Sequence, residues 1–128
     1  MFQIKNSLLI FLGGGIGCLL RYWISNSMYS LFGRNFPYAT LIVNCSGSFL
    51  MGLLLSIILE HFPNHVPYLR ALLLIGFLGG YTTFSSFSIE TLTLIETGEW
   101  LYALLNVNLN IILGISIAGL GTLLGRSL

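Results

Sequence analysis

The stretch GFLGGYTTFSSFS, residues 76–88, contains most of the groups with which this chain could bind or conduct a solute. Two adjacent glycines, two β-branched threonines and three serines form a poor helix, so we expect a helix that breaks within residues 79–83. Carbonyl groups freed by such a break commonly hold a cation, and the N-terminus of the next half-helix favours an anion. The stretch also fits a simpler interpretation, in which the glycines permit close packing and the serines bond back to their own helix.

Two aromatic residues follow the expected break. Phe84 and Phe87 are three residues apart, so they share one face of a helix. Such a pair usually serves packing, but the edge of a phenyl ring is electropositive and can contact a small anion. The hydroxyls of Thr83 and Ser86 would add hydrogen-bond donors beside the rings. This combination suits an anion that has lost most of its water.

Asparagines form a second polar group. Asn106 and Asn110 are one helical turn apart and Tyr102 lies one turn before them, which places the three on one face. An amide that faces lipid is costly, so Asn44 and these residues must face protein or water. The stripe therefore either lines a polar pathway or bonds one helix to another. We interpret Asn108, which points roughly the opposite way, as helix–helix glue.

The composition identifies the elements that must position these groups. The chain has 128 residues, of which 55% are hydrophobic and 7% charged, whereas a soluble domain carries roughly a quarter charged residues. This excludes a soluble globular domain, and the high apolar content excludes disorder. Five scattered cations form no nucleic-acid surface. No catalytic triad or intramembrane carboxylate pair is present, so we expect an integral membrane protein that is not an enzyme.

The hydrophobic stretches predict four membrane-spanning helices in a single all-α domain, since a span needs about 20 apolar residues. The expected helices cover residues 7–29, 38–60, 68–96 with the break at 79–83, and 100–126. Arg21 falls near the far end of the first span, where its side chain can reach the headgroups. Glu90 lies within the third span, just beyond the aromatic pair.

The distribution of positive charge gives a weak orientation signal. Four spans place both termini and the second loop on one side, with Lys5, Arg70 and Arg126. Arg34, with or without Arg21, lies on the other side. So small a bias permits insertion in both orientations and antiparallel pairing of two copies, and it equally permits one modest orientation preference.

Four segments resemble the Fluc (CrcB) family of fluoride channels nearly from end to end. The most specific is Gly79-Gly80-Tyr81-Thr82-Thr83-Phe84-Ser85-Ser86-Phe87-Ser88 with Glu90; the others are Gly13-Gly14-Gly15-Ile16-Gly17 with Leu20-Arg21-Tyr22, Thr40-Leu41-Ile42-Val43-Asn44 with Gly47, Phe49 and Gly52, and Ala103-Leu104-Leu105-Asn106-Val107 with Asn110 and Gly114. The departures are slight: Cys18 replaces a small residue, Ala39 a common glycine, and Ser86 a common threonine whose hydroxyl it keeps.

The resemblance implies an antiparallel homodimer with two pores and a structural sodium ion at its centre. The ion would be held by the backbone carbonyls of Gly79 and Thr82 from each copy. Fluoride would pass the ring edges of Phe84 and Phe87, with Asn44, Thr83 and Ser86 as nearby polar groups. Tyr102, Asn106 and Asn110 would continue the polar track.

The resemblance also implies passive export of fluoride from the cytoplasm, across a bacterial inner membrane. Arg21 would lie in the vestibule of the pore, and Glu90 would either cap the pathway or pair with an arginine. The alternative is a proton- or sodium-coupled small exporter, since small multidrug transporters also have four short helices and pair antiparallel. Those proteins carry a glutamate in the first span, and this chain has none there.

Overall fold

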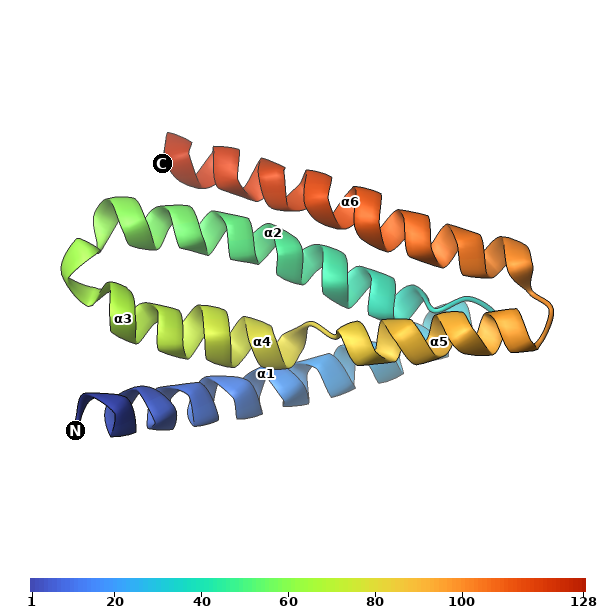
Figure 1. Cartoon of the computed structure of the whole chain (residues 1–128), viewed down its shortest axis with the longest axis horizontal. Helices are drawn as coiled ribbons and strands as arrows, with labels where there is room; N and C mark the ends of the chain where they lie inside the picture. The colour runs from blue at the N-terminus through green and yellow to red at the C-terminus, as the bar shows by residue number, and fades with distance from the viewer.

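Apolar helices make up nearly the whole chain, and the computed structural model describes every residue from Met1 to Leu128. In chain order the elements are α1 (Phe2–Phe32), α2 (Tyr38–His61), the 3₁₀ turn η1 (Pro63–His65), α3 (Val66–Leu69), the π-helix η2 (Arg70–Leu78), α4 (Gly79–Tyr81), α5 (Phe84–Glu96) and α6 (Trp100–Ser127). The elements η1 to α5 together form the third span, so the chain folds into an elongated bundle of four rods (Figure 1).

Four helical segments are long and apolar enough to cross a membrane, as the sequence predicts. They cover Phe2–Phe32, Tyr38–His61, Pro63–Glu96 and Trp100–Ser127. The first is longer at both ends than the predicted 7–29. Glycines with positive φ end α1 at Gly33 and turn the chain from α5 into α6 at Gly98, a conformation that costs glycine little. The protein is therefore a multi-pass membrane protein.

The third span departs from a regular helix in two places. Arg70–Leu78 is wound as a π-helix, which the sequence analysis did not predict. The break itself is shorter than expected, because the double glycine stays helical within α4 and only Thr82 and Thr83 are extended. The absence of a side chain at Gly80 serves helix packing, because a methyl group there would overlap the backbone of Gly14 on α1.

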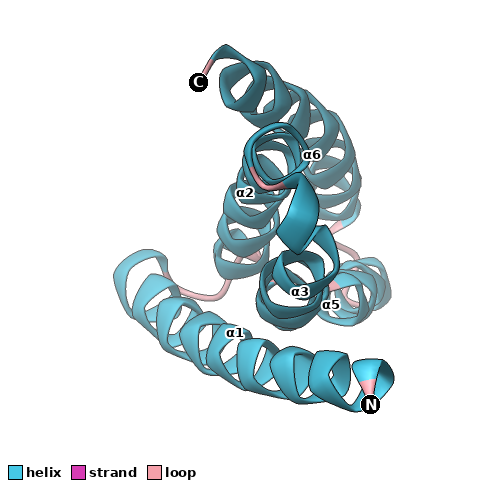
Figure 2. Ribbon diagram, turned by 90° about the vertical axis from the view of Figure 1, so that its left-hand side faces the viewer, coloured by secondary structure: helices cyan, strands magenta, loops and turns pink.

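Close backbone approaches hold the rods together in two pairs. The first helix lies along η2 and α4, and α2 lies along α6; Figure 2 shows α2 between α6 and the third span. A methyl group at Gly13 would overlap the Leu72 carbonyl oxygen, and one at Gly121 would overlap the Phe49 carbonyl oxygen. Small residues at these seams let helices pack by contact where lipid supplies no hydrophobic drive.

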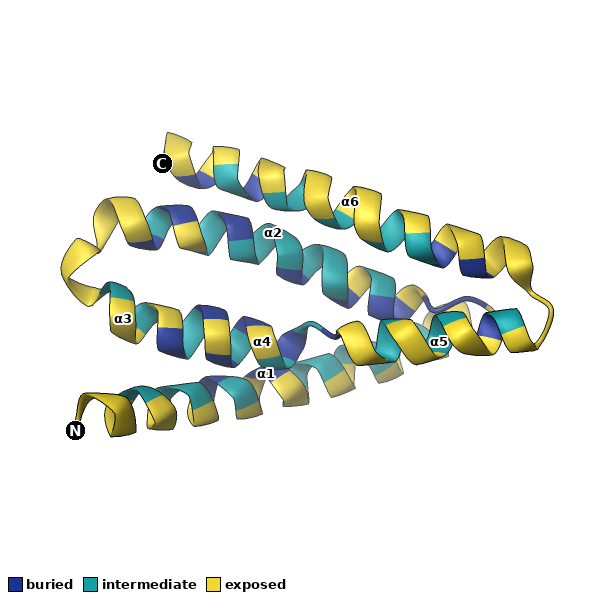
Figure 3. Cartoon of the chain, viewed as in Figure 1, coloured by how far each residue is buried: buried dark blue, intermediate teal, exposed yellow.

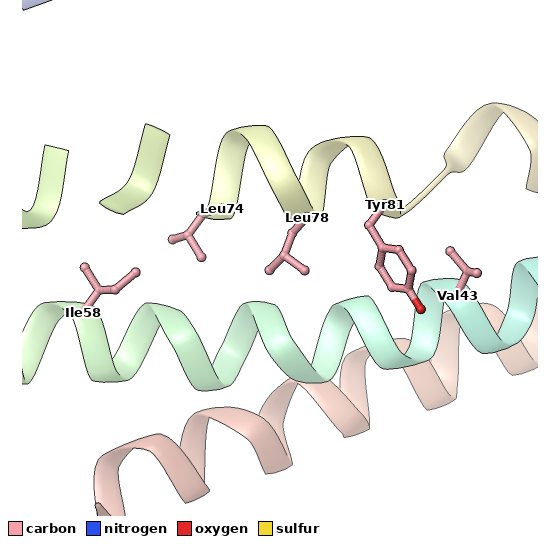
Figure 4. Close-up of a cluster of buried hydrophobic side chains, with 5 residues drawn as sticks. All are labelled: Val43, Ile58, Leu74, Leu78 and Tyr81. Carbon is pink, nitrogen blue, oxygen red and sulfur yellow. The ribbon is translucent and has the colours of Figure 1, made fainter. Parts of the chain in front are cut away.

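A small apolar cluster joins α2 to the third span. It consists of Val43 and Ile58 of α2 facing Leu74, Leu78 and Tyr81 (Figure 4). Most other large apolar side chains are exposed, and the outward faces of α1 and α6 are exposed along much of their length (Figure 3). This pattern is expected where lipid or another protein surrounds the bundle.

Candidate functional site

Asn44 on α2 holds the break in the third span. Its Oδ1 accepts a hydrogen bond from the backbone N–H of Thr83 at 2.9 Å, and its Nδ2 donates to the Thr83 carbonyl at 3.0 Å. One side-chain amide thereby satisfies both backbone groups of an extended residue that is 8% exposed. Extended backbone at membrane depth requires such partners, so Asn44 fixes where the helix breaks.

Two carbonyls lose their helical donors at this break. In an unbroken helix the N–H of Thr83 would bond the Gly79 carbonyl, but it bonds Asn44 instead. The N–H of Ser86, which would bond the Thr82 carbonyl, donates to the Thr83 Oγ1 as an N-cap contact at 3.2 Å. Gly79 and Thr82 are the two residues predicted to bind sodium, and unwound carbonyl oxygens are suitable ligands for that ion. These two carbonyl oxygens are therefore chemically suitable ligands for the predicted sodium ion.

A line of hydrogen-bonded side chains continues from Asn44 along α6. Asn44 Nδ2 also donates to Asn110 Oδ1 at 3.1 Å, and Asn110 Nδ2 donates to the carbonyl and Oδ1 oxygens of Asn106 at 2.9 and 3.0 Å. Asn106 Nδ2 donates in turn to Thr91 Oγ1 on α5 at 2.9 Å. The structure thus brings together three of the predicted asparagines, and the sequence analysis missed Thr91.

Tyr102, the remaining member of the predicted stripe, has no hydrogen bond to this line. Tyr102 packs its ring on Phe36 with the centroids 5.8 Å apart, an edge contact outside the asparagine line. Asn106 is fully buried, at 0% exposure, so it faces protein and no open space. Asn108 bonds only its own helix, donating to the Leu104 carbonyl at 2.8 Å, and is exposed. Within a single chain it therefore bonds no other helix.

The two predicted phenylalanines lie against each other at the start of α5. Their ring centroids are 5.6 Å apart and the ring planes are inclined by 48°. Phe84 is 79% exposed, whereas Phe87 is half-buried. The ring of Phe84 therefore projects from the surface of a single chain, next to the break.

A polar hollow of about 280 Å³ collects four other predicted residues. Arg21, Thr83, Ser86 and Glu90 line it, together with Cys18, Tyr22, Ser25, Tyr29, Thr40 and Val43. Thr83 Oγ1 donates to Ser86 Oγ at 3.1 Å within it. The hollow lies between α1, α2 and the third span, so residues far apart in the sequence form one polar space.

A second hollow, of about 310 Å³, also borders Thr83. Asn44, Thr82, Thr83 and Phe84 line it, with Gly47, Ser48, Met51 and Ala118. Thr83 belongs to both hollows. Around it the site offers hydroxyl and amide hydrogen atoms, ring edges and free carbonyls, with no acidic group in the second hollow. Such groups can coordinate small ions that have given up their water.

Glu90 is held by partners that could not be identified from the sequence. Tyr29 on α1 donates its hydroxyl to Glu90 Oε1 at 3.1 Å, and Thr40 on α2 donates to the same oxygen at 2.9 Å. Glu90 Oε2 is buried without a hydrogen-bond partner. Neither predicted alternative, a cap or a pair with an arginine, mentioned these hydroxyls, since only the packing of three helices brings them together.

Known proteins are similar to this chain over nearly its whole length. The sequence model of the family described as CrcB-like protein, Camphor Resistance (CrcB), matches residues 8–122. The fluoride-specific ion channel FluC of Coxiella burnetii (strain CbuK_Q154) is 58% identical over 123 residues, which are 96% of this chain and 99% of that protein.

More distant relatives carry the same description. The fluoride-specific ion channel FluC of Shewanella baltica (strain OS185) is 49% identical over 118 residues, 92% of this chain and 94% of that protein. The protein of the same name from Methylococcus capsulatus is 50% identical over 119 residues, 93% of this chain and 52% of that protein. The family match over residues 8–122 includes the second and third spans and most of the first and fourth.

Proposed function

The chain belongs to the CrcB family, whose curated relatives are fluoride-specific ion channels, and we propose that it conducts fluoride passively across a bacterial inner membrane. The observation that carries this function is the 58% identity to a FluC protein over 96% of the chain. The polar groups around Thr83, in the middle of a membrane span, supply a physical reason for it. No enzymatic chemistry is needed.

The proposed fluoride path runs along the start of α5. The exposed ring of Phe84 and the inclined ring of Phe87 present aromatic hydrogens, which are the positive edges of their quadrupoles. The Ser86 hydroxyl accepts a hydrogen bond from Thr83 and keeps its own hydrogen to donate next to them. Asn44, whose two N–H groups bond the Thr83 carbonyl and Asn110, holds Thr83 in place beside the path. A small anion can exchange part of its water for these neutral groups, and Arg21 is the cation that lines the same hollow.

The asparagines of α6 take two different parts in this proposal. Asn110 contacts Asn44 directly and continues the polar track. Asn106 is buried, so it acts by orienting Asn110 through two hydrogen bonds. Tyr102 lies further along the same helix and serves as the next polar group of the track. Arg21 and Glu90 line the hollow beside Thr83, where we place the vestibule.

We also propose that two copies pair antiparallel to form two pores. Backbone opened at membrane depth must be covered by protein or line a cavity, and Phe84 and Gly79 beside the break are exposed in a single chain. A second copy that lies over this face would cover them. The weak charge bias, with Lys5, Arg70 and Arg126 opposed by Arg34, permits both orientations.

The carbonyls of Gly79 and Thr82 from each copy would hold a structural sodium ion at the dimer centre. Both lack the amide donors of a regular helix, because Asn44 and the Thr83 hydroxyl take those donors. A bound sodium ion would supply positive charge that joins the two breaks. The dimer should then dissociate more readily after purification in a large organic cation than in sodium, with recovery when sodium returns.

Passive export follows from the chemistry of a weak acid. Hydrogen fluoride crosses the bilayer uncharged and dissociates in a more alkaline cytoplasm, so fluoride accumulates there. A channel then suffices, because the anion leaves down its own gradient. A coupled exporter would instead need a proton or sodium gradient to move fluoride.

Reconstituted liposomes separate these mechanisms. The purified protein is placed in vesicles with a fluoride gradient, and a potassium ionophore collapses the voltage. Rapid fluoride release with chloride retained supports the channel, whereas release that requires a proton or sodium gradient would establish the coupled exporter. Phe84→Ile and Phe87→Ile should each slow release strongly and leave the dimer intact on gel filtration. Unchanged flux in both variants would exclude a role for the ring edges.

A further inference from the structure

A third hollow, of about 230 Å³, opens at the end of the molecule where α1 passes into α2. The turn contributes Arg34, Asn35 and Pro37, and α5 contributes Ile89, Glu90, Thr93 and Leu94, with Tyr29 from α1. Figure 1 shows this end opposite the two termini, where the start of α2 lies near α5. Arg34 and Glu90 are the charged residues in its wall, one of each sign.

Tyr29 and Glu90 separate this outer hollow from the inner one, because both residues line both hollows. The Tyr29 hydroxyl donates to Glu90 Oε1 at 3.1 Å. The other side of the Tyr29 ring faces the turn, where the Arg34 guanidinium carbon lies 4.7 Å from the ring centroid. A contact over an aromatic face fixes a guanidinium in place. The cation is therefore held in the wall of the outer hollow, which shares Tyr29 and Glu90 with the inner hollow that Thr83 and Ser86 line.

The signs of the charges determine what such an entrance admits. Glu90 alone would make the outer hollow repel anions, whereas the guanidinium of Arg34 offsets that charge. Arg34 lies in an exposed turn, so its field acts on ions that are still in water and is screened by salt. A fixed charge of this kind raises the local concentration of the opposite ion and hence its rate of entry.

We propose that Arg34 is the recruiting charge of a mouth for the fluoride path, which opens through the outer hollow beside Tyr29 and Glu90. This inference rests on the proposed channel function and adds an entrance to it. Arg34 does not bind the permeating ion tightly; it raises the supply of fluoride to the inner hollow. Its contribution depends on the charge alone, so lysine replaces it and glutamine does not.

The test compares wild type with Arg34→Gln, Arg34→Lys and Arg34→Glu in vesicles of zwitterionic lipid. Fluoride release is measured far below saturation, with a large impermeant anion setting the ionic strength. A unit charge about 7 Å from a passing ion in water changes the local anion concentration two- to threefold. We expect the glutamine variant to lose about that factor near 0.01 M ionic strength, where the Debye length is about 30 Å. The glutamate variant should lose more, and the lysine variant little.

The ionic strength and a second arginine, Arg126, provide the controls. Near 1 M ionic strength the Debye length falls to about 3 Å, so the four proteins should release fluoride at nearly the same rate. Arg126→Gln removes the same charge from the last turn of α6, at a residue that lines none of the three hollows, and should have little effect. Gel filtration checks that each variant assembles as the wild type does.

Three results would overturn the inference. Equal fluoride release by all variants at low salt shows that the charge of Arg34 is irrelevant to entry. A loss that persists at high salt assigns Arg34 a structural or headgroup-anchoring role. If either result is obtained while the wild-type protein conducts fluoride, the channel function stands and only the proposed role of Arg34 at the mouth is refuted. A wild-type protein that passes no fluoride refutes the channel function, and the mouth with it.

Discussion

Replacing Asn44 by alanine removes three hydrogen bonds at once. They join Asn44 to the Thr83 N–H at 2.9 Å, to the Thr83 carbonyl at 3.0 Å and to Asn110 Oδ1 at 3.1 Å. Thr83 is 8% exposed, so water cannot readily replace the lost partner. Hydrogen bonds between membrane helices average about 0.6 kcal/mol and reach about 1.7 kcal/mol, so the substitution should lower the free energy of unfolding by about 2 to 5 kcal/mol.

The assay is reversible unfolding by sodium dodecyl sulfate in mixed micelles, followed by circular dichroism. Asn108→Ala is the matched control, because it removes the same amide from a membrane helix. Asn108 bonds only the Leu104 carbonyl of its own helix and is exposed. We expect its variant to unfold within about 0.5 kcal/mol of wild type, as surface substitutions usually do.

The two variants together decide whether Asn44 holds the break. If Asn44→Ala unfolds as Asn108→Ala does, then the extended conformation at Thr83 does not depend on the amide clamp. The account of the freed carbonyls would then fail as well, since the clamp is what diverts the Thr83 N–H from the Gly79 carbonyl. A large loss of stability in Asn44→Ala but not in Asn108→Ala supports the amide clamp, and this result does not depend on which ion the protein conducts.

Two further predictions concern packing and a buried hydroxyl pair. Gly13→Ala should destabilise the protein by about 1 to 3 kcal/mol, because the new methyl group would overlap a backbone carbonyl of η2 that cannot move aside. Gly15→Ala, where nothing lies within 4 Å, should instead stabilise it by about 0.5 to 1 kcal/mol. Equal effects of the two substitutions in the same unfolding assay would contradict close packing of α1 on η2 at Gly13. Ser46 and Tyr81 share a hydrogen bond of 2.8 Å, so Ser46→Ala and Tyr81→Phe should show a coupling energy of about 0.6 to 1.7 kcal/mol in a double-mutant cycle, and strict additivity would show that the pair contributes nothing.

Local features of the chain were predictable because they depend on composition and on nearby residues. The scarcity of charge and the long apolar runs determined a membrane protein with four spans. The threonines and serines after Gly80 indicated a break, and the motif around them indicated the family. The seam glycines were recognisable as packing residues, since a missing side chain has few other uses in a membrane helix.

The position and partners of the break depended on contacts that the sequence does not display. The double glycine is the poorest helix former in this stretch, yet it remains helical, and Gly80 packs closely on α1. The break falls at Thr82 and Thr83, where a residue 39 positions earlier in the chain captures the backbone. The regular spacing places Tyr102 one turn from Asn106, but it did not disclose that the Tyr102 ring packs on Phe36 from a loop.

The sequence by itself determined which residues this protein carries into the membrane, because each apolar run must cross a layer of fixed thickness. Only the tertiary structure decided which of them meet. Glu90 joins Tyr29 and Thr40 through packing between α1, α2 and α5, and Arg34 comes to rest over the Tyr29 ring where the chain turns. A side chain's partners depend on the relative rotation of whole helices, and no local pattern of residues specifies that rotation.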